Sequence, residues 1–213
     1  MVNRSGDVPK SVIRRLPVYL RILDILIRNE QEIVSSRELS DVTGFTAEQI
    51  RKDLTYFGAF GTRGTGYTVK YLRDMILKII GLNERTSIVV VGVGHLGTAL
   101  IRYNVTKNPY VNVVAAFDKD PSVIDKEILG VEILHTSKMK DIMEKYDVKV
   151  AILTVNPESA QEAVETIIDS GINVIFNFAP EKLIVPENVH VHNADLSIEL
   201  QSLIYYATIE KQQ

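Results

Sequence analysis

The fold of the second half of this 213-residue chain can be predicted from residues 87–97, which are Ser87-Ile88-Val89-Val90-Val91-Gly92-Val93-Gly94-His95-Leu96-Gly97. The uninterrupted apolar run before Gly92 predicts a buried strand, and the run from Gly92 to Gly97 is a G-x-G-x-x-G pattern. Asp118 follows 21 residues after Gly97, at the end of the next predicted strand. A glycine pattern alone is a weak signal. A strand before it, a helix after it and an acidic residue at this distance are typical of a dinucleotide-binding loop.

The loop residues have distinct predicted roles. Gly92 permits the tight turn, Gly94 lets the backbone approach a pyrophosphate, and Gly97 lets the helix pack close to the strand. Backbone N–H groups around the start of the helix receive the phosphates, and they belong to Val93, His95 and Leu96.

Asp118 and Lys119 decide which dinucleotide is expected. The Asp118 carboxylate can accept hydrogen bonds from the adenosine ribose hydroxyls and would repel a 2′-phosphate, so the predicted cofactor is NAD(H) rather than NADP(H). Lys119 complicates this prediction because a cation there could tolerate a phosphate, although such a lysine is more often a solvated charge. A glycine turn that binds nothing is the alternative for the whole loop.

Strands and helices alternate through the rest of this half. Predicted strands cover 87–92, 111–118, 131–134, 150–155, 173–178 and 189–193, and predicted helices cover 95–105, 137–146 and 158–170. Apolar strands separated by helices predict an α/β fold, a Rossmann domain over 84–193 with a doubly wound parallel sheet covered on both faces. A last helix over 195–209 carries one apolar stripe, made of Leu196, Leu200, Leu203, Ile204 and Ala207.

Two later strand ends are expected to complete the cofactor site, because ligands of such sheets lie beyond the carboxyl ends of the strands. Their residues are Thr154, Val155 and Asn156, and Asn177, Phe178, Ala179 and Pro180. Phe178 and Pro180 would form a largely apolar surround for the nicotinamide. Packing at the edge of the core is an equally open interpretation of these residues.

The first half of the chain has helical periodicity instead. Apolar residues recur at helical spacing over 10–28, from Ile13 to Ile27, and Pro17 inside this pattern allows a kink or a later helix start. Ser35 to Glu38 is a capping-box pattern that opens a short helix ending at Gly44. Predicted elements then follow as a helix from Thr46 to about Phe57, a glycine-tipped β-hairpin over 58–69 and a helix over 69–80.

Helix, tight turn, helix and hairpin together predict a winged helix-turn-helix over 1–80, with the helix from Thr46 as the recognition helix. Glutamine and arginine side chains on such a helix can pair with adenine and guanine edges. Arg63, between glycines at the hairpin tip, is placed to reach phosphate or the minor groove. The predicted DNA-contacting residues are Thr46, Gln49, Arg51, Lys52, Thr55, Tyr56 and Arg63. An ordinary solvated face is the alternative for Arg51 and Lys52.

Charge is divided unevenly along the chain. Residues 1–80 hold 13 lysines and arginines against 9 acidic residues, whereas the whole chain has a net charge of −3. A basic first half joined to an acidic second half favours a polyanionic partner for the first half only. Helical periodicity stops near 81–85, where we place the domain boundary. The sequence has no cysteine, which excludes disulfides and thiolate zinc sites, and no stretch predicts a membrane span or signal peptide, so a cytoplasmic location is expected.

Four motifs resemble those of the Rex redox-sensing repressors. They are Arg14-Arg15-Leu16-Pro17-Val18-Tyr19, Gln49-Ile50-Arg51-Lys52-Asp53-Leu54-Thr55-Tyr56-Phe57-Gly58, Gly61-Thr62-Arg63-Gly64-Thr65-Gly66-Tyr67 and Phe176-Asn177-Phe178-Ala179-Pro180. The match covers essentially the whole chain in order. The resemblance implies a homodimer that represses fermentation and anaerobic respiration genes by sensing the NADH/NAD⁺ ratio, holding palindromic operator DNA with NAD⁺ or no ligand and releasing it with NADH.

The same resemblance implies that the C-terminal segment, residues 194–213, is exchanged with the partner subunit. It places Arg15, Tyr103 and Asp195 in a switch in which the aspartate pairs with the arginine or the tyrosine according to state, and it adds Tyr103 to the cofactor-binding residues. Leu196 follows where the family can carry an aromatic residue, and it has no ring to stack on the nicotinamide.

Two other interpretations stay open from the sequence. An NAD-dependent dehydrogenase would need a substrate domain and a general acid or base near the nicotinamide. The other domain here is a small helical module, and the histidines (His95, His135, His190 and His192) are poorly placed for that role. A winged-helix repressor with a vestigial Rossmann domain is disfavoured by the intact glycines and Asp118. We therefore predict no enzymatic activity and no metal site, since a His190–His192 pair has no further ligands in view.

Overall fold

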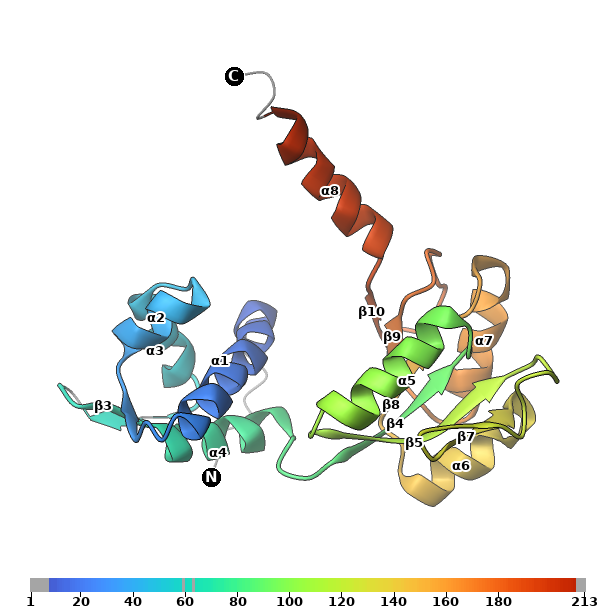
Figure 1. The fold of residues 1–213 in the computed structure, drawn as a ribbon, viewed down its shortest axis with the longest axis horizontal. Coiled ribbons are helices and arrows are strands. Elements are labelled where there is room, and N and C mark those ends of the chain that lie inside the picture. Colours follow the sequence, from blue (N-terminus) through green and yellow to red (C-terminus); the bar gives the residue numbers. More distant parts are fainter. Residues whose placement is uncertain (1–7, 59, 63, 210–213) are drawn as a thin grey trace. The chain divides into compact units, whose positions relative to one another are not determined.

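The computed structural model describes residues 8–58, 60–62 and 64–209. Contacts within the chain fall into two compact units, which divide between Glu84 and Arg85 (Figure 1).

The first unit is mostly helical, with α1 (Lys10–Arg28), α2 (Ser36–Thr43), α3 (Ala47–Thr55) and α4 (Val69–Ile80). α1 continues through Pro17, so the later start that this proline allowed does not occur. Its buried face is Val12, Leu16, Tyr19, Leu20 and Leu23. Ile13 and Ile27, which the periodicity placed on the apolar stripe, are 44% and 39% exposed.

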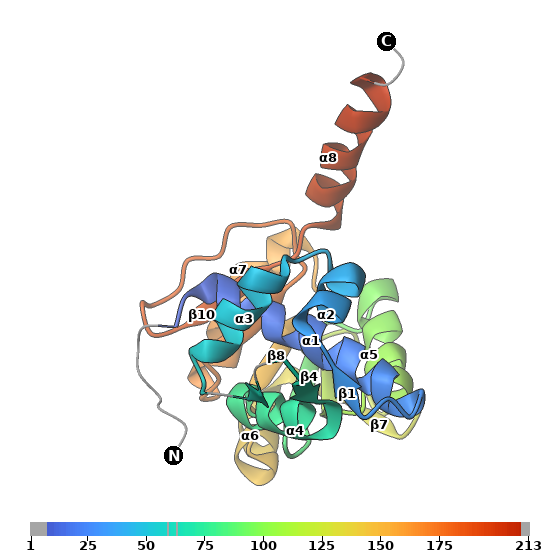
Figure 2. The same ribbon diagram turned by 90° about the vertical axis from the view of Figure 1, so that its left-hand side faces the viewer.

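The helix-turn-helix forms as its capping residues predict. The Ser35 hydroxyl accepts from the backbone N–H of Glu38 over 3.1 Å, and the Glu38 carboxylate accepts from that of Ser35 over 2.7 Å. α2 ends at Gly44 with a φ of +74°, and α3 begins after Thr46, whose hydroxyl accepts from the N–H of Gln49. α3 ends at Thr55, before the predicted end at Phe57. α2 and α3 lie side by side (Figures 1 and 2).

A small antiparallel sheet completes this unit, with β1 (Ile33–Val34), β2 (Gly61–Thr62) and β3 (Gly66–Thr68) in the order β1-β3-β2. β2 and β3 are the predicted hairpin, whereas β1 was not predicted. A Cβ atom on Gly66, which has a φ of +96°, would lie 2.6 Å from the carbonyl oxygen of Val34. Glycine at this position therefore lets β1 pair with the hairpin.

The second unit is built on a seven-stranded sheet of order β10-β9-β8-β4-β5-β7-β6. Its strands are β4 (Thr86–Val91), β5 (Val111–Asp118), β6 (Glu127–Ile128), β7 (Val131–His135), β8 (Val150–Leu153), β9 (Val174–Asn177) and β10 (His190–Asn193). Neighbouring strands are parallel except for the edge pair β6–β7. Apart from β6, which was not predicted, this is the 3-2-1-4-5-6 order of a doubly wound sheet, with β4 as the first strand and the switch point beside it.

Helices α5 (His95–Lys107), α6 (Met139–Tyr146) and α7 (Pro157–Asp169) cover the two faces unequally. Val89 and Val91 pack with α6 and α7 on one face, and Ile88 and Val90 pack with α5 on the other. The connections 119–126 and 178–189 contain no helix. Of the helices that the structure describes in this unit, α5 alone packs on its face.

The last helix, α8 (Leu196–Ile209), buries none of its described side chains. Its large apolar residues are between 55% and 65% exposed, and they are Leu196, Ile198, Leu200, Leu203, Ile204, Tyr205 and Tyr206. Within the described residues no helix is both long and apolar enough to cross a membrane.

Candidate functional site

The glycine loop lies between the carboxyl end of β4 and the start of α5, and each of its glycines meets a different environment. Gly92 has a φ of +94°, and a Cβ there would lie 2.8 Å from the carbonyl group of Thr154. A Cβ on Gly97 would collide with the carbonyl oxygen of Gly92. Around Gly94, by contrast, a Cβ would have nothing within 4 Å. Gly92 and Gly97 are therefore required by the fold, whereas Gly94 opens onto free space.

Two side chains hold the loop in place. Asp118, at the end of β5, accepts from the backbone N–H of Val93 over 2.6 Å through Oδ2. Its Oδ1 accepts from the N–H groups of Lys119 and Asp120 over 2.7 and 3.0 Å. Thr154, which follows β8, donates its hydroxyl to the carbonyl oxygen of Gly92 over 2.7 Å. The loop is thus tied to the neighbouring strand on either side of β4.

A cleft of about 390 Å³ opens beside this loop. Half of the predicted cofactor-binding residues line it, namely Gly92, Val93, Gly94, Asp118, Lys119, Thr154, Val155 and Asn156. The sequence analysis missed further lining residues, among them Asp120, Val123, Thr136, Met139, Ser159 and Thr166. Thr136 directly follows the carboxyl end of β7, and this is the signal by which it could have been found.

The cleft has donors and acceptors suited to a nucleotide. α5 begins at His95, so the N–H groups of His95 and Leu96 belong to a first helical turn, where the helix itself supplies no acceptor. The positive end of the α5 helix dipole lies at these N–H groups and favours the binding of a phosphate. Lys119, on the rim, is paired with Glu162 of α7 over 2.6 Å. A backbone hydrogen bond from Ser122 lowers the pKa of Asp120, which keeps that carboxylate charged.

The other predicted strand end, residues 177–180 at and after the end of β9, does not line the cleft. Asn177 is 1% exposed, and its amide donates to the carbonyl oxygen of Ala179 and to Asn193 Oδ1 while accepting from the N–H of Ala179. It therefore braces the segment after β9, and it does not line the cleft. The half-buried ring of Phe178 packs 4.4 Å from that of Phe176. Ala179 is buried and Pro180 exposed, and neither lines the cleft.

The recognition helix candidate, α3, divides its residues between two sides. Ile50, Asp53 and Leu54 are buried, and Phe57, expected in the core, is only half-buried. Gln49 is half-buried as well, whereas the other predicted DNA-contacting residues that the structure describes on and beside α3 are exposed: Thr46, Arg51, Lys52, Thr55 and Tyr56. The prediction for Arg63 falls outside the described residues.

A groove of about 560 Å³ runs between α3, the start of α2 and the hairpin. Arg51 donates to the Ser36 hydroxyl over 2.8 Å, and Arg51 and Thr55 line the groove together with Gly64, Thr65 and Gly66 of the hairpin. Burial raises the pKa of Tyr67 at its base, so this phenol stays neutral. Arg51 and the hydroxyl groups of Ser35, Ser36, Thr55 and Thr65 line this groove, and side chains of these kinds suit a nucleic-acid backbone.

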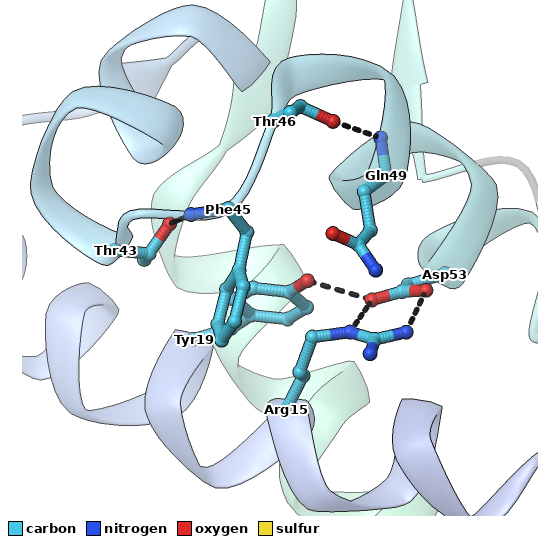
Figure 3. Close-up of polar contacts among 7 residues, drawn as sticks. All are labelled: Arg15, Tyr19, Thr43, Phe45, Thr46, Gln49 and Asp53. Carbon is cyan, nitrogen blue, oxygen red and sulfur yellow. Dashed lines mark hydrogen bonds and ion pairs between the residues drawn. The ribbon is translucent and has the colours of Figure 1, made fainter.

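Behind α3, the Asp53 carboxylate joins α3 to α1 (Figure 3). Arg15 donates to it through Nε and Nη2 over 2.6 and 2.8 Å, and Tyr19 donates its hydroxyl over 2.7 Å. The hydrogen bond to Asp53 raises the pKa of Arg15, and burial raises the pKa of Tyr19. Phe45, in the turn before α3, lies edge-on to the Tyr19 ring at 5.9 Å. Sequence reasoning did not single out Asp53.

The three residues of the predicted switch have separate surroundings in the single chain. Arg15 is paired with Asp53, and Tyr103 on α5 is 59% exposed. Asp195 caps α8 by accepting from the N–H groups of Ser197 and Ile198 over 2.8 and 3.2 Å. Among the described residues there is no group of three or more His, Asp or Glu side chains that could hold a metal ion.

A winged helix-turn-helix and a doubly wound sheet with a glycine loop, joined in one chain, define a class of DNA-binding regulator with a nucleotide-binding domain. Two family models match accordingly, one described as "Putative DNA-binding protein N-terminus" over residues 7–55 and one described as "CoA binding domain" over residues 83–181. A curated relative that is 53% identical over 98% of this chain is a redox-sensing transcriptional repressor Rex, so the chain belongs to the Rex family.

Its relatives match along nearly their full length. The Rex repressor of Natranaerobius thermophilus is 53% identical over 98% of this chain and 95% of its own, and that of Listeria monocytogenes is 40% identical over 97% and 96%. The crystal structure of RSP, a Rex-family repressor, in complex with β-NAD⁺ and operator DNA has a TM-score of 0.89 at 35% identity, covering 98% of this chain and 96% of RSP. RSP in complex with β-NADH has a TM-score of 0.84 at 34% identity, covering 98% of both chains.

Proposed function

We propose that this protein binds palindromic operator DNA as a homodimer in the cytoplasm, represses transcription, and is released when NADH replaces NAD⁺. The observation that carries the proposal is the combination of an open, braced glycine loop in one unit with an exposed polar helix face beside a hairpin in the other. RSP, which has the same fold, has been solved with β-NAD⁺ and operator DNA and with β-NADH.

The cleft residues suit an adenine dinucleotide. The space at Gly94 and the first turn of α5 would receive a pyrophosphate. Asp118 Oδ2 accepts one hydrogen bond, from Val93, which leaves acceptor capacity for a ribose hydroxyl. A phosphate at the 2′ or 3′ oxygen would be repelled by this carboxylate. The pairing of Lys119 with Glu162 reduces the positive charge that could offset this repulsion. NAD(H) is therefore preferred to NADP(H) and to coenzyme A.

Discrimination between the redox forms requires a site that treats a charged and a neutral ring differently. NAD⁺ carries a positive nicotinamide, and NADH carries a neutral one. Phe176 and Phe178 pack together at the end of β9 and are not among the residues that line the cleft. We expect the nicotinamide to reach this strand end, where apolar surroundings penalise the charged ring. A tenfold preference needs only about 1.4 kcal/mol.

The homodimer is supported by two surfaces that the single chain leaves uncovered. The first is α8, since an isolated helix of 14 residues is marginal in water and this one exposes its apolar residues. The second is the α5 face of the sheet near Val174 and Phe176, where no described helix of the unit packs beyond α5. We propose that α8 of each subunit covers the second subunit. A two-fold dimer then reads two half-sites one or more helical turns apart.

Within this proposal Thr46, Gln49, Arg51, Lys52, Thr55, Tyr56 and Arg63 contact DNA. Arg15, Tyr103 and Asp195 form the switch between subunits, and NADH binding moves the two recognition helices out of register with their half-sites. This scheme gives the chain no enzymatic role, and the described residues that line the cleft include no histidine.

A gel-shift titration over a series of NADH/NAD⁺ ratios tests the proposal. The operator is first selected from a randomised duplex library with the purified wild-type protein. We expect the fraction of bound operator to fall as NADH replaces NAD⁺, with NADP(H) and coenzyme A having little effect. Equal operator affinity at every ratio would contradict the redox response, and turnover of NADH would contradict the non-enzymatic role.

A further inference from the structure

The recognition helix carries one carboxylate that faces inward. Asp53 is 2% exposed, and its oxygens accept hydrogen bonds from Arg15 Nε, Arg15 Nη2 and the Tyr19 hydroxyl. Arg15 and Tyr19 lie four residues apart on one face of α1, so the Asp53 carboxylate is bound by side chains of a single helix (Figure 3). Burying charged groups costs free energy unless they are paired, and every partner here is in place.

Asp53 lies on a different side of α3 from Arg51 and Thr55, two of the predicted DNA-contacting residues. Asp53 lies two residues after Arg51 and two before Thr55, which places it about 160° around the helix from both. The exposed and the anchored sides of α3 are thus nearly opposite. A roll of α3 by about 15° about its axis would move side chains on its surface by about 1.4 Å. Productive recognition geometry tolerates about 0.5 Å.

Apolar contacts alone hold the rotation of α3 about its axis only loosely, because hydrophobic burial is not directional. Ile50 and Leu54, the other buried residues of α3, provide contacts of this kind. A fork of two guanidinium–carboxylate hydrogen bonds has a strict geometry, and the Tyr19 hydroxyl adds a third direction. Phe45, which contacts the Tyr19 ring and lies 5.8 Å from the Arg15 guanidinium carbon, links the turn before α3 to the same pair.

We propose that Asp53 is a positioning residue for operator recognition: held by Arg15 and Tyr19, it sets the rotation of α3 and thereby the specificity of the protein for its operator over other DNA. The inference rests on the proposed DNA-binding function. It concerns how the reading helix is aimed, and it does not require Asp53 to touch DNA.

A buried ion pair of this kind is a poor source of stability, because an apolar pair of similar volume often serves equally well. This property permits a test in which stability and specificity separate. The double variant Arg15→Met/Asp53→Leu removes one positive and one negative charge, so the net charge of the unit is unchanged. We expect it to fold with a similar melting temperature. Arg15 also belongs to the proposed switch, so a loss of specificity in this variant supports the proposal only together with a loss in Tyr19→Phe, which leaves Arg15 in place.

The readout is the ratio of dissociation constants for a shuffled duplex and for the selected operator, measured with saturating NAD⁺ at one salt concentration. We expect this ratio to fall at least tenfold in the double variant, mainly through weaker operator binding. Tyr19→Phe, which removes one of the three bonds and keeps the fork, should lower the ratio about threefold. Asp24→Asn is the matched control, because Asp24 pairs with Arg73 over 2.6 Å and joins α1 to α4 instead. It should leave the ratio unchanged.

A wild-type ratio in either the folded double variant or Tyr19→Phe overturns the proposal. So does an equal loss of affinity for both duplexes, because that is what a merely structural role produces. If the double variant does not fold, Tyr19→Phe decides alone. If the wild-type protein selects no duplex from the library, the proposed DNA-binding function itself is refuted. If the wild type and the variants bind the selected operator with equal specificity, only the positioning role of Asp53 is refuted.

Discussion

The hydroxyl of Thr154 donates to the carbonyl oxygen of Gly92 over 2.7 Å, and this bond ties the end of β8 to the glycine loop that follows β4. A Cβ on Gly97 would come within 2.8 Å of the same Thr154 oxygen, so strand end, loop and helix meet at one point. The shape of the nucleotide loop therefore depends on a side chain 62 residues away in sequence.

Replacing Thr154 with valine keeps the side-chain volume and removes the donor. The free energy of unfolding should fall by about 1 kcal/mol, because the carbonyl of Gly92 loses a partner. NADH affinity should fall several-fold because the loop is less well held. Denaturant unfolding and NADH fluorescence titration measure the two effects. Thr106→Val is the control, since Thr106 makes its hydrogen bond to Arg102 on the exposed surface of α5. Unchanged NADH binding in Thr154→Val would show that the bond does not shape the site.

The glycine series separates fold from binding. Gly94→Val places a side chain where nothing lies within 4 Å, so stability should change by no more than about 1 kcal/mol while NADH binding is lost. Gly97→Ala should instead destabilise the domain by about 1–3 kcal/mol, because the new methyl group overlaps the Gly92 carbonyl. Calorimetry and NADH titration of both variants provide the comparison. If Gly94→Val binds NADH as wild type does, the pyrophosphate does not bind beside Gly94.

Asp118 should control the choice of coenzyme. In Asp118→Asn the single amide oxygen can accept from Val93 or from Lys119 and Asp120, but not from both sides. The negative charge that repels a 2′-phosphate is also gone. We expect NADH to bind more weakly and the preference for NADH over NADPH to shrink about tenfold, or about 1.4 kcal/mol. Competition titrations with both coenzymes measure this preference. Retention of the full wild-type preference would argue that another group faces the ribose.

The capping box at α2 leads to a pH prediction. The backbone hydrogen bond from Ser35 lowers the pKa of Glu38 below its ordinary value of 4.5. A lowered carboxyl pKa stabilises the folded state above the ordinary value, and this contribution is lost as the pH falls through the lowered one. The stability difference between wild type and Glu38→Gln should therefore be constant from pH 7 to about 5 and shrink below about 4. Ser35→Ala should cost about 1 kcal/mol at neutral pH. A Glu38→Gln difference that grows on acidification would contradict the sign.

The dimer proposal predicts that the apolar side chains of α8 act only between subunits. Leu203→Glu changes a side chain that is 64% exposed in the single chain, so it should leave the fold of each unit intact. Sedimentation should nevertheless show monomers, and operator affinity should fall sharply because paired half-site binding is lost. Gln201→Glu, on the same exposed helix, is the charge control. A Leu203→Glu protein that remains dimeric would place the subunit interface elsewhere.

Long apolar runs and helix caps made most of the fold predictable. β4 and the capping box at Ser35 are specified by adjacent residues, and the predicted elements around them are found within a few positions. β1 and β6 escaped prediction because a strand of two residues shows no periodicity. Their pairing depends on where another strand arrives, as the close approach at Gly66 shows.

The functional residues were less evenly predictable. Asn177 was expected beside the nicotinamide because it follows an apolar strand, but a strand end also needs its turn to be braced, and this asparagine performs that task. Asp53 was passed over because a charged residue in an amphipathic helix is usually solvated. Its spacing of three from Ile50 already placed it on the buried side.

A glycine loop held by Thr154 and Asp118 has consequences for timing. Because its shape is set when the domain folds, an arriving coenzyme has little backbone left to order, and association should proceed at the rate of ordinary encounters. The lag between a shift in cellular redox balance and a change in promoter occupancy would then be governed by the residence time of the departing coenzyme.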